Sequence, residues 1–222
     1  MNYTYQYPHP AVTTDIVIFS VRDNALQVLL IKRGGEPFKG SWALPGGFVR
    51  IDESLDECAK RELHEEAGLE DVYLEQLYSF GKIGRDPRER VISVAYFTLT
   101  PSEHLKPSAG TDASDVKWFA ISELPELAFD HAEIIRVARE RLAAKMEYST
   151  IGLQFMNEEF TLSQLQIVYE QATGKTLDKR NFRKWILSLD LIAETGKKFA
   201  AGAHRPAMLY RIKDPDRVDI IR

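Results

Sequence analysis

The sequence is poor in the features that mark secreted and membrane proteins. It contains one cysteine, Cys58, so it cannot form an internal disulfide, which is consistent with a reducing compartment. No stretch reaches eighteen consecutive apolar residues, and the polar residues 1–10 lack the apolar core of a signal sequence. Internal repeats and low-complexity tracts are absent as well. We therefore expect a cytoplasmic protein without a membrane partner.

Charge is distributed unevenly along the chain. Residues 1–149 contain 17 Lys and Arg against 24 Asp and Glu, whereas residues 150–222 contain 12 against 9, within a net charge of −4. A chain of 222 residues has room for a domain of ordinary size and a second, small one. The opposite signs predict two modules with different partners.

The first module has the pattern of a mixed sheet flanked by helices. Apolar, β-branched runs at residues 13–20 and 26–32 flank the turn sequence RDNA, which predicts a hairpin. Further strands are expected at residues 72–80, 91–100 and 116–120. Residues 131–146 repeat apolar side chains at helical spacing, which predicts a helix with one buried face. The fold class is therefore α/β.

An acidic helix is expected between residues 55 and 67. Ser54 and Glu57 have the spacing of a capping box, and Gly68 supplies the stop. Within it, three glutamates stand at positions i, i+3 and i+4, namely Glu62, Glu65 and Glu66. This spacing gathers their carboxylates on one face, within reach of a common ion. Because clustered carboxylates repel one another, the helix predicts a site for Mg²⁺ or Mn²⁺.

Nine positions around this helix resemble the Nudix box. They are Gly47, Glu53, Arg61, Glu62, Leu63, Glu65, Glu66, Gly68 and Leu69. The resemblance implies an α/β/α Nudix sandwich with a mixed sheet, and hydrolysis of a nucleoside diphosphate linked to a second moiety. It also implies that Glu62, Glu65 and Glu66 bind the metal and that the Gly47 carbonyl can join them. We expect Arg61 and Glu53 to form a salt bridge that orients the catalytic carboxylates of Glu65 and Glu66.

A general base is expected in this family from a separate loop near the last strand. Asp115, three residues before Trp118, is the first candidate, with Asp112 and Glu103 behind it. An acid that is merely solvated is the competing interpretation for each of them.

The segment at residues 80–97 carries three arginines: Arg85, Arg88 and Arg90. Their guanidiniums could clamp a phosphate or stack on a base, although surface arginines of a loop are an equally good interpretation. The sequence RDPR followed by VISVAYF resembles the ADP-ribose pyrophosphatase branch of the Nudix proteins. That resemblance implies ADP-ribose or a related nucleotide as the ligand.

The remainder of the chain has the pattern of a winged-helix domain. We place the Nudix domain at residues 1–148, a linker at 149–159 and the small C-terminal domain at 160–222. Thr161 and Gln164 form a second capping box, and another helix starts near Asp178. Short strands at residues 191–195 and 207–212 are joined by the loop sequence GKKFAAGAHRP.

This second domain is basic where a DNA contact is expected. Residues 175–213 contain 10 Lys and Arg against three acids. The predicted DNA-binding residues lie on the second helix and in the wing: Lys179, Arg180, Arg183, Lys184, Lys197, Lys198 and Arg205. A solvated amphipathic helix is the competing interpretation for the helical ones.

Taken with the Nudix box, the tail sequences FTLSQLQIVYEQATGKTLDKRNFRKWI and AHRPAMLYRI resemble the Nudix-related transcriptional regulators called NrtR. Members of that family are expected to be homodimers that bind double-stranded operator DNA and respond to ADP-ribose, controlling NAD metabolism. Many such regulators have a degenerate box. This chain departs from them because it keeps Arg61 and all three glutamates.

Four functions follow from these patterns. The preferred one is a protein that hydrolyses ADP-ribose and also regulates transcription. The alternatives are a repressor that senses ADP-ribose without turnover, a related repressor with an arabinose-type sugar effector, and a housekeeping ADP-ribose pyrophosphatase that does not bind DNA.

Overall fold

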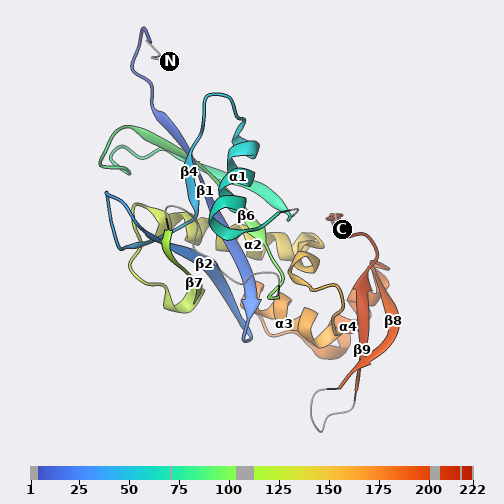
Figure 1. The fold of residues 1–222 in the computed structure, drawn as a ribbon. Helices are drawn as coiled ribbons and strands as arrows, with labels where there is room; N and C mark the ends of the chain where they lie inside the picture. Colours follow the sequence, from blue (N-terminus) through green and yellow to red (C-terminus); the bar gives the residue numbers. More distant parts are fainter. Residues whose placement is uncertain (1–4, 71, 104–112, 201–205, 216, 222) are drawn as a thin grey trace. The chain divides into compact units, whose positions relative to one another are not determined.

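The computed structural model of the chain (Figure 1) describes residues 5–70, 72–103, 113–200, 206–215 and 217–221. The chain divides into two compact units. The first contains residues 1–19, 28–98 and 105–138; the second contains residues 20–27, 99–104 and 139–222. None of the described helices is long and apolar enough to cross a bilayer.

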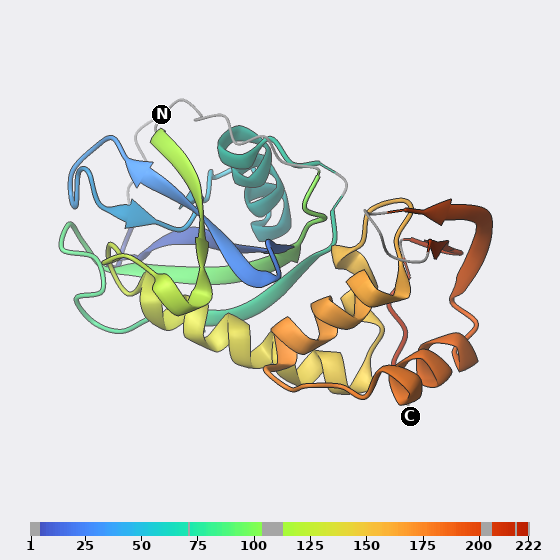
Figure 2. The ribbon, with the colours of Figure 1, turned by 90° about the horizontal axis from the view of Figure 1, so that it is seen from below.

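The first unit is built on a seven-stranded sheet. Its strands are β1 (Ala11–Arg22), β2 (Ala25–Arg33), β3 (Trp42–Ala43), β4 (Gly46–Phe48), β5 (Leu74–Phe80), β6 (Val91–Leu99) and β7 (Ala113–Ala120). The order is β3-β2-β1-β6-β5, with β4 paired to β1 and β7 paired to β2. Figure 2 shows α1 (Leu55–Ala67) on one face and the start of α2 (His131–Tyr148) on the other. The predicted α/β/α sandwich is therefore confirmed.

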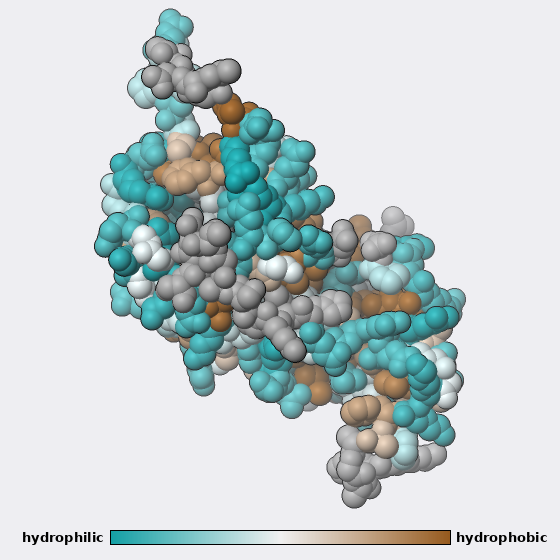
Figure 3. Space-filling view, viewed as in Figure 1, coloured by the Kyte–Doolittle hydropathy of each residue, from teal (hydrophilic) through white to brown (hydrophobic). Residues whose placement is uncertain are grey.

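Helix α1 has the limits that its capping residues predict. The Ser54 hydroxyl accepts a hydrogen bond from the Glu57 amide, and the Glu57 carboxylate accepts one from the Ser54 amide. Gly68 ends the helix at φ 64°, a conformation that few other residues adopt without strain. Ala59 and Leu63 pack against Ile16, Ile18 and Leu29 of the sheet. The outward side of α1 is polar, in keeping with the largely hydrophilic face in Figure 3.

The second unit contains the winged helix. Its elements are η2 (Ile151–Phe155), α3 (Leu162–Thr173), α4 (Lys179–Ser188), β8 (Ile192–Phe199) and β9 (Ala207–Ile212). The short helix η1 (Ile121–Glu123) belongs to the first unit. The strands β8 and β9 pair antiparallel, and Phe160 exchanges two backbone hydrogen bonds with Tyr210. Leu165, Val168, Phe182 and Ile186 are buried in its core.

Two segments of this unit differ from the sequence expectation. Residues 149–159, predicted as a linker, contain the helix η2, whose Ile151, Leu153 and Phe155 are buried. The basic segment Gly196 to Phe199, predicted as loop, continues β8, because Lys198 and Phe199 pair with Met208 and Ala207. Pairing with a distant strand is a tertiary effect that local turn residues do not predict.

Gly152 supplies a test of how tightly η2 is packed. A Cβ added there would lie 2.6 Å from the Tyr169 ring and 2.9 Å from the Met146 methyl carbon. We therefore expect Gly152→Ala to lower the free energy of unfolding by roughly 1–3 kcal/mol, measured by chemical denaturation. Gly35→Ala is the control, since a Cβ there meets nothing within 4 Å. Equal stability of the two variants would contradict this packing.

Candidate functional site

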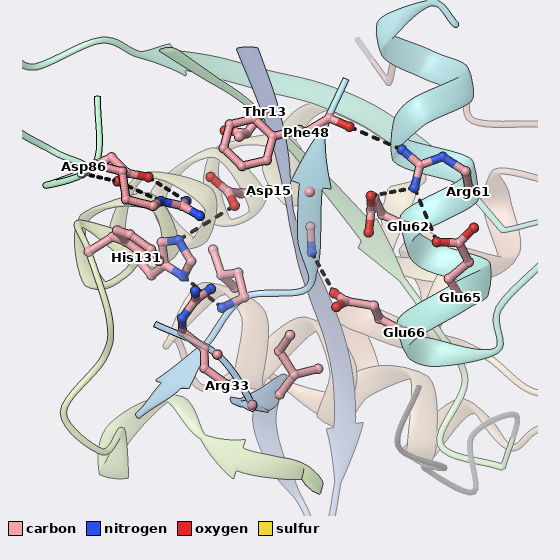
Figure 4. Close-up of a pocket in the computed structure, with 18 of the residues that line it drawn as sticks. Thr13, Asp15, Arg33, Phe48, Arg61, Glu62, Glu65, Glu66, Asp86 and His131 are labelled. Carbon is pink, nitrogen blue, oxygen red and sulfur yellow. Dashed lines mark hydrogen bonds and ion pairs between the residues drawn. The ribbon is translucent and has the colours of Figure 1, made fainter. Parts of the chain in front are cut away.

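The three glutamates of α1 lie along one side of a cavity, which we call the acidic wall (Glu62, Glu65 and Glu66). Figure 4 shows them projecting from the helix towards β4. Glu62 and Glu66 are buried, while Glu65 is exposed. Glu62 packs directly on Gly47, where a Cβ would come within 2.2 Å of its Oε1. The Glu66 carboxylate accepts a hydrogen bond of 2.8 Å from the Gly46 amide.

Arg61 forms hydrogen bonds with two glutamates of the acidic wall and with Glu53. Its Nε and Nη2 donate to the two oxygens of Glu53 at 2.9 and 2.7 Å, so the predicted salt bridge is present. The bidentate hydrogen bond from Arg61 holds the pKa of Glu53 at about 2. Nη1 donates to Glu62 at 2.5 Å and to Glu65 at 3.3 Å. Arg61 therefore orients two of the three expected metal ligands.

The three carboxylates of the acidic wall accept hydrogen bonds from different donors. Glu62 and Glu65 direct oxygens at Arg61, whereas Glu66 points at the Gly46 amide. Within the described ranges, no three His, Cys, Asp or Glu side chains are grouped as a metal site. The role of these carboxylates as metal ligands therefore stays a prediction.

The donor set nevertheless fits a divalent ion. The three carboxylates and Gly47 line the same cavity and offer only oxygen ligands, which Mg²⁺ and Mn²⁺ prefer. The absence of a side chain at Gly47 is what lets Glu62 lie against β4. Burial raises the pKa of Glu62, so a nearby cation would stabilise its charged form.

Further guanidinium groups line the same cavity, and Figure 4 shows Arg33 across it from Glu66. We call Arg33, Arg85 and Arg88 the cationic wall. Arg85 is buried, and its Nη2 lies 2.6 Å from Asp130 and 3.4 Å from Asp15. Asp15 also accepts a short hydrogen bond from Ser93. The predicted ligand-binding residue Arg85 is therefore held firmly by two acids.

His131 completes this buried cluster. Its Nδ1 accepts a hydrogen bond of 2.8 Å from the Leu44 amide, so the proton of the neutral ring lies on Nε2. Nε2 is 3.6 Å from Asp15. Burial lowers the pKa of His131, which keeps the ring neutral at physiological pH.

Arg88 is stacked between aromatic rings. Asp86 accepts hydrogen bonds from its Nε and Nη2 at 3.0 and 2.7 Å. The guanidinium carbon then lies 5.1 Å from the Phe48 ring centroid and 5.9 Å from that of Phe129. Arg90 has a different position: it is exposed, donates to the Lys82 carbonyl and does not line the cavity.

Arg33, at the end of β2, was not singled out from the sequence. Its Nε donates to the Pro37 carbonyl at 2.8 Å, and its guanidinium carbon lies 4.9 Å from the Phe129 centroid. Burial, followed by repulsion from Arg88, lowers its pKa. The sequence signal was a basic residue closing an apolar strand, which is too common to indicate a site. The sequence analysis also missed three other residues of the cavity region, because single acids and histidines are too common to indicate a site: Asp15, Asp130 and His131.

The cavity between the two walls measures about 820 Å³, within the range of small-ligand sites. Asp115, the candidate general base, does not line it; its carboxylate accepts a hydrogen bond from the Val116 amide on β7. Glu103 is exposed, and Asp112 lies outside the described residues. The role of Asp115 stays a prediction.

A second cavity, of about 860 Å³, lies in the winged-helix unit. Three of the predicted DNA-binding residues line it: Lys179 and Arg183 of α4 and Lys198 of β8. The Nε of Arg183 has no hydrogen-bond partner in the described part of the chain. Arg180 and Lys184 are exposed on α4, Lys197 pairs with Glu159 at 2.7 Å, and Arg205 lies outside the described residues.

Comparison with protein families matches both units. Residues 10–138 match the NUDIX domain, and residues 152–212 match the NrtR DNA-binding winged helix domain. The chain is also 39% identical over 209 residues to the ADPR responsive transcriptional repressor NtrR of Acinetobacter baylyi, covering 92% of this chain and 83% of that one. The chain belongs to the NrtR family of Nudix proteins. The matches do not test the exact boundary between the two domains, so its place at residue 148 stays a prediction.

Two solved structures and one enzyme extend the comparison of this NrtR-family chain. It resembles Shewanella oneidensis NrtR complexed with a 27mer DNA, with a TM-score of 0.82 and 39% identity, over 92% of this chain and 94% of that chain. The NUDIX domain of the same protein complexed with ADP ribose gives a TM-score of 0.57 and 38% identity, over 64% and 94%. An ADP-ribose pyrophosphatase of Methanocaldococcus jannaschii is 44% identical over 130 residues, 59% of this chain and 73% of that enzyme.

Proposed function

We propose that this NrtR-family protein is a transcriptional repressor that responds to ADP-ribose and also hydrolyses it. The observation that carries the proposal is the cavity of the first unit, where a complete acidic wall faces a cationic wall. Two similar proteins support both functions, an ADPR responsive transcriptional repressor and an ADP-ribose pyrophosphatase. We further propose that it works in the cytoplasm as a homodimer on operator DNA of NAD-metabolism genes.

Nudix hydrolases use divalent metal ions, and we propose Mg²⁺ or Mn²⁺ here. Glu62, Glu65 and Glu66 would hold the ion, which lowers the pKa of bound water and neutralises phosphate charge. Arg61, anchored by Glu53, keeps two of these carboxylates in position. Addition of one water across the diphosphate linkage converts ADP-ribose to AMP and ribose 5-phosphate.

We propose that the cationic wall binds the ligand and positions neighbouring side chains. Arg88 presents a guanidinium that Asp86 and two phenylalanine rings hold in place, so little conformational freedom is lost on binding. Arg85 acts through the cluster that positions Asp15 and His131 at the cavity. Asp115 stays our candidate for the general base.

One experiment tests both halves of this proposal. Full-length protein is titrated onto labelled DNA from upstream of its own gene, with and without ADP-ribose, and AMP release is measured in the same Mg²⁺ buffer. We expect ADP-ribose to change DNA affinity and AMP to accumulate. A ligand effect without AMP would favour the non-catalytic repressor, whereas AMP release without DNA binding would favour the housekeeping pyrophosphatase. DNA binding that responds to a pentose instead of ADP-ribose would favour the sugar-sensing alternative.

The basic cavity of the winged helix gives a separate prediction. Arg183→Gln should weaken DNA binding at low salt and reduce the slope of log K against log salt by about 1, because one phosphate contact is lost. Fluorescence anisotropy over a salt series measures both. Lys175→Gln is the matched control, since Lys175 is exposed, pairs with Glu147 and does not line the cavity. Identical slopes for the two variants would remove Arg183 from the interface.

A further inference from the structure

The backbone of residues 44–47 connects the far side of the cavity to the acidic wall. We propose that His131 is a positioning residue: its hydrogen bond to the Leu44 amide holds this segment where Glu62 and Glu66 lie against it. The inference rests on the proposed function, because it concerns the carboxylates that would hold the metal ion. Figure 4 shows the His131 ring next to Asp15 and away from Glu66, so His131 acts through the backbone and not by contact with the acidic wall.

The hydrogen bond between His131 and Leu44 joins two buried groups. His131, the first residue of α2, is 3% exposed, and its Nδ1 accepts from the Leu44 amide at 2.8 Å. Leu44 is 2% exposed and lies between β3 and β4, outside both strands. Because a buried amide without an acceptor is costly, the imidazole takes the place that a neighbouring strand would have. His131 therefore fixes the backbone at the start of residues 44–47.

The imidazole is itself held on its other side. Nε2, which carries the proton of the neutral ring, lies 3.6 Å from Oδ1 of Asp15. The other oxygen of Asp15 accepts from Ser93 and from Arg85. The Phe129 ring lies 5.2 Å from the imidazole, measured between centroids. These neighbours leave the ring little freedom to turn, so Nδ1 keeps its direction towards Leu44.

Residues 46 and 47 contact the two buried glutamates of the acidic wall. The Gly46 amide donates to the Glu66 carboxylate at 2.8 Å, and the Glu62 carboxylate lies directly on Gly47. Gly46 is two residues beyond Leu44, and the planar peptide groups between them transmit a displacement with few free torsions to absorb it. A shift at Leu44 would therefore move the donor of Glu66 and the surface that supports Glu62.

Pairing with β1 is a weak anchor for this segment. Strand β4 has three residues, of which two are glycines, and the Pro45 carbonyl accepts one further hydrogen bond from the Ile16 amide at 2.8 Å. Glycine loses more conformational freedom on folding than any other residue, so a short glycine-rich strand is costly to hold in one conformation. The hydrogen bond from Leu44 to His131 supplies a second anchor at the end where the segment leaves β3.

Hydrolysis of ADP-ribose and binding of Mn²⁺ by the full-length protein test this role. His131→Leu removes the acceptor and should lower kcat roughly tenfold to one hundredfold with little change in KM, because it displaces the acidic wall and not the ligand. It should also raise the Kd for Mn²⁺ about tenfold without ADP-ribose present, measured by electron paramagnetic resonance. His131→Asn should restore most of both values, since its Oδ1 can accept close to the position of Nδ1.

Two further variants make the result specific. His131→Gln carries its acceptor one bond farther out, near the position of Nε2, so it should behave like His131→Leu and replaces it if that variant does not fold. His64→Leu is the matched control, since His64 is exposed on α1, pairs with Glu70 and does not line the cavity. It should leave kcat and the Kd for Mn²⁺ unchanged. Melting temperatures show which variants are folded.

The outcomes separate this role from the proposed function. Wild-type kcat and Mn²⁺ affinity in folded His131→Leu, or equal defects in His131→Asn and His131→Gln, would overturn the positioning role and leave the proposed function standing. A raised KM at unchanged kcat would overturn it too, because the ring would then contact the ligand. If the wild type binds Mn²⁺ but releases no AMP, hydrolysis is rejected and the Mn²⁺ affinities alone decide the role of His131. If the wild type does neither, both proposals fail.

Discussion

Glu66→Gln should lower the rate of ADP-ribose hydrolysis at least about a hundredfold while leaving DNA binding at the wild-type level. The substitution keeps the size of the side chain and an oxygen that can accept from the Gly46 amide, but it removes the negative charge that a divalent ion needs. AMP release with saturating Mg²⁺ measures the first effect, and anisotropy with operator DNA measures the second. The double variant Glu65→Gln with Glu66→Gln should abolish AMP release altogether.

The control for this prediction is Glu70→Gln. Glu70 follows α1, is exposed and pairs with His64 instead of lining the cavity. Its substitution removes the same charge and should leave turnover unchanged. Wild-type turnover in Glu66→Gln would exclude Glu66 as a metal ligand. If the wild-type protein itself releases no AMP, the non-catalytic repressor is the correct alternative.

Arg85→Met should lower the free energy of unfolding by about 3–5 kcal/mol, the cost of leaving buried charges unpaired. Asp15 loses an ion partner at 3.4 Å, and Asp130 loses its partner at 2.6 Å. Asp15 is the more affected acid because it is buried; Ser93 and His131 remain beside it. Denaturant unfolding of the full-length chain measures the loss.

Two comparisons make this result specific. Arg90→Met changes an exposed arginine of the same segment, whose guanidinium donates to the Lys82 carbonyl, and should cost less than about 0.5 kcal/mol. Arg85→Met combined with Asp15→Asn should recover part of the stability, since the uncompensated charge is removed. A loss below about 1 kcal/mol in Arg85→Met alone would show that the cluster is not an energetic centre of the fold.

Features encoded over a few neighbouring residues were predictable from the sequence. Helix α1 has its predicted limits because Ser54, Glu57 and Gly68 determine both ends through local hydrogen bonds and backbone conformation. The acidic wall was predictable for the same reason: its glutamates share one helix, so their spacing alone places them on one side. The salt bridge between Arg61 and Glu53 followed from the family motif and is present.

Features that depend on contacts between segments far apart in the sequence were not predictable. Arg85 meets Asp15 and Asp130 across 70 and 45 residues, and no spacing rule predicts such a meeting. Arg33 lies beside Phe129, which is distant in the sequence, so its place at the cavity could not be predicted either. Likewise, β8 extends to Phe199 because β9 is there to pair with it, and η2 is too short to give a periodic pattern.

The contact between Gly47 and Glu62 has a consequence for how such proteins diversify. Any side chain at Gly47 would displace the Glu62 carboxylate, because the space for its first carbon is already taken. One codon change there would disable the acidic wall. The cationic wall, carried by β2 and by the loop between β5 and β6, would be left intact. On the proposed function, a substitution at Gly47 would therefore remove turnover and keep ligand recognition, so a single substitution would separate an enzyme from a pure receptor.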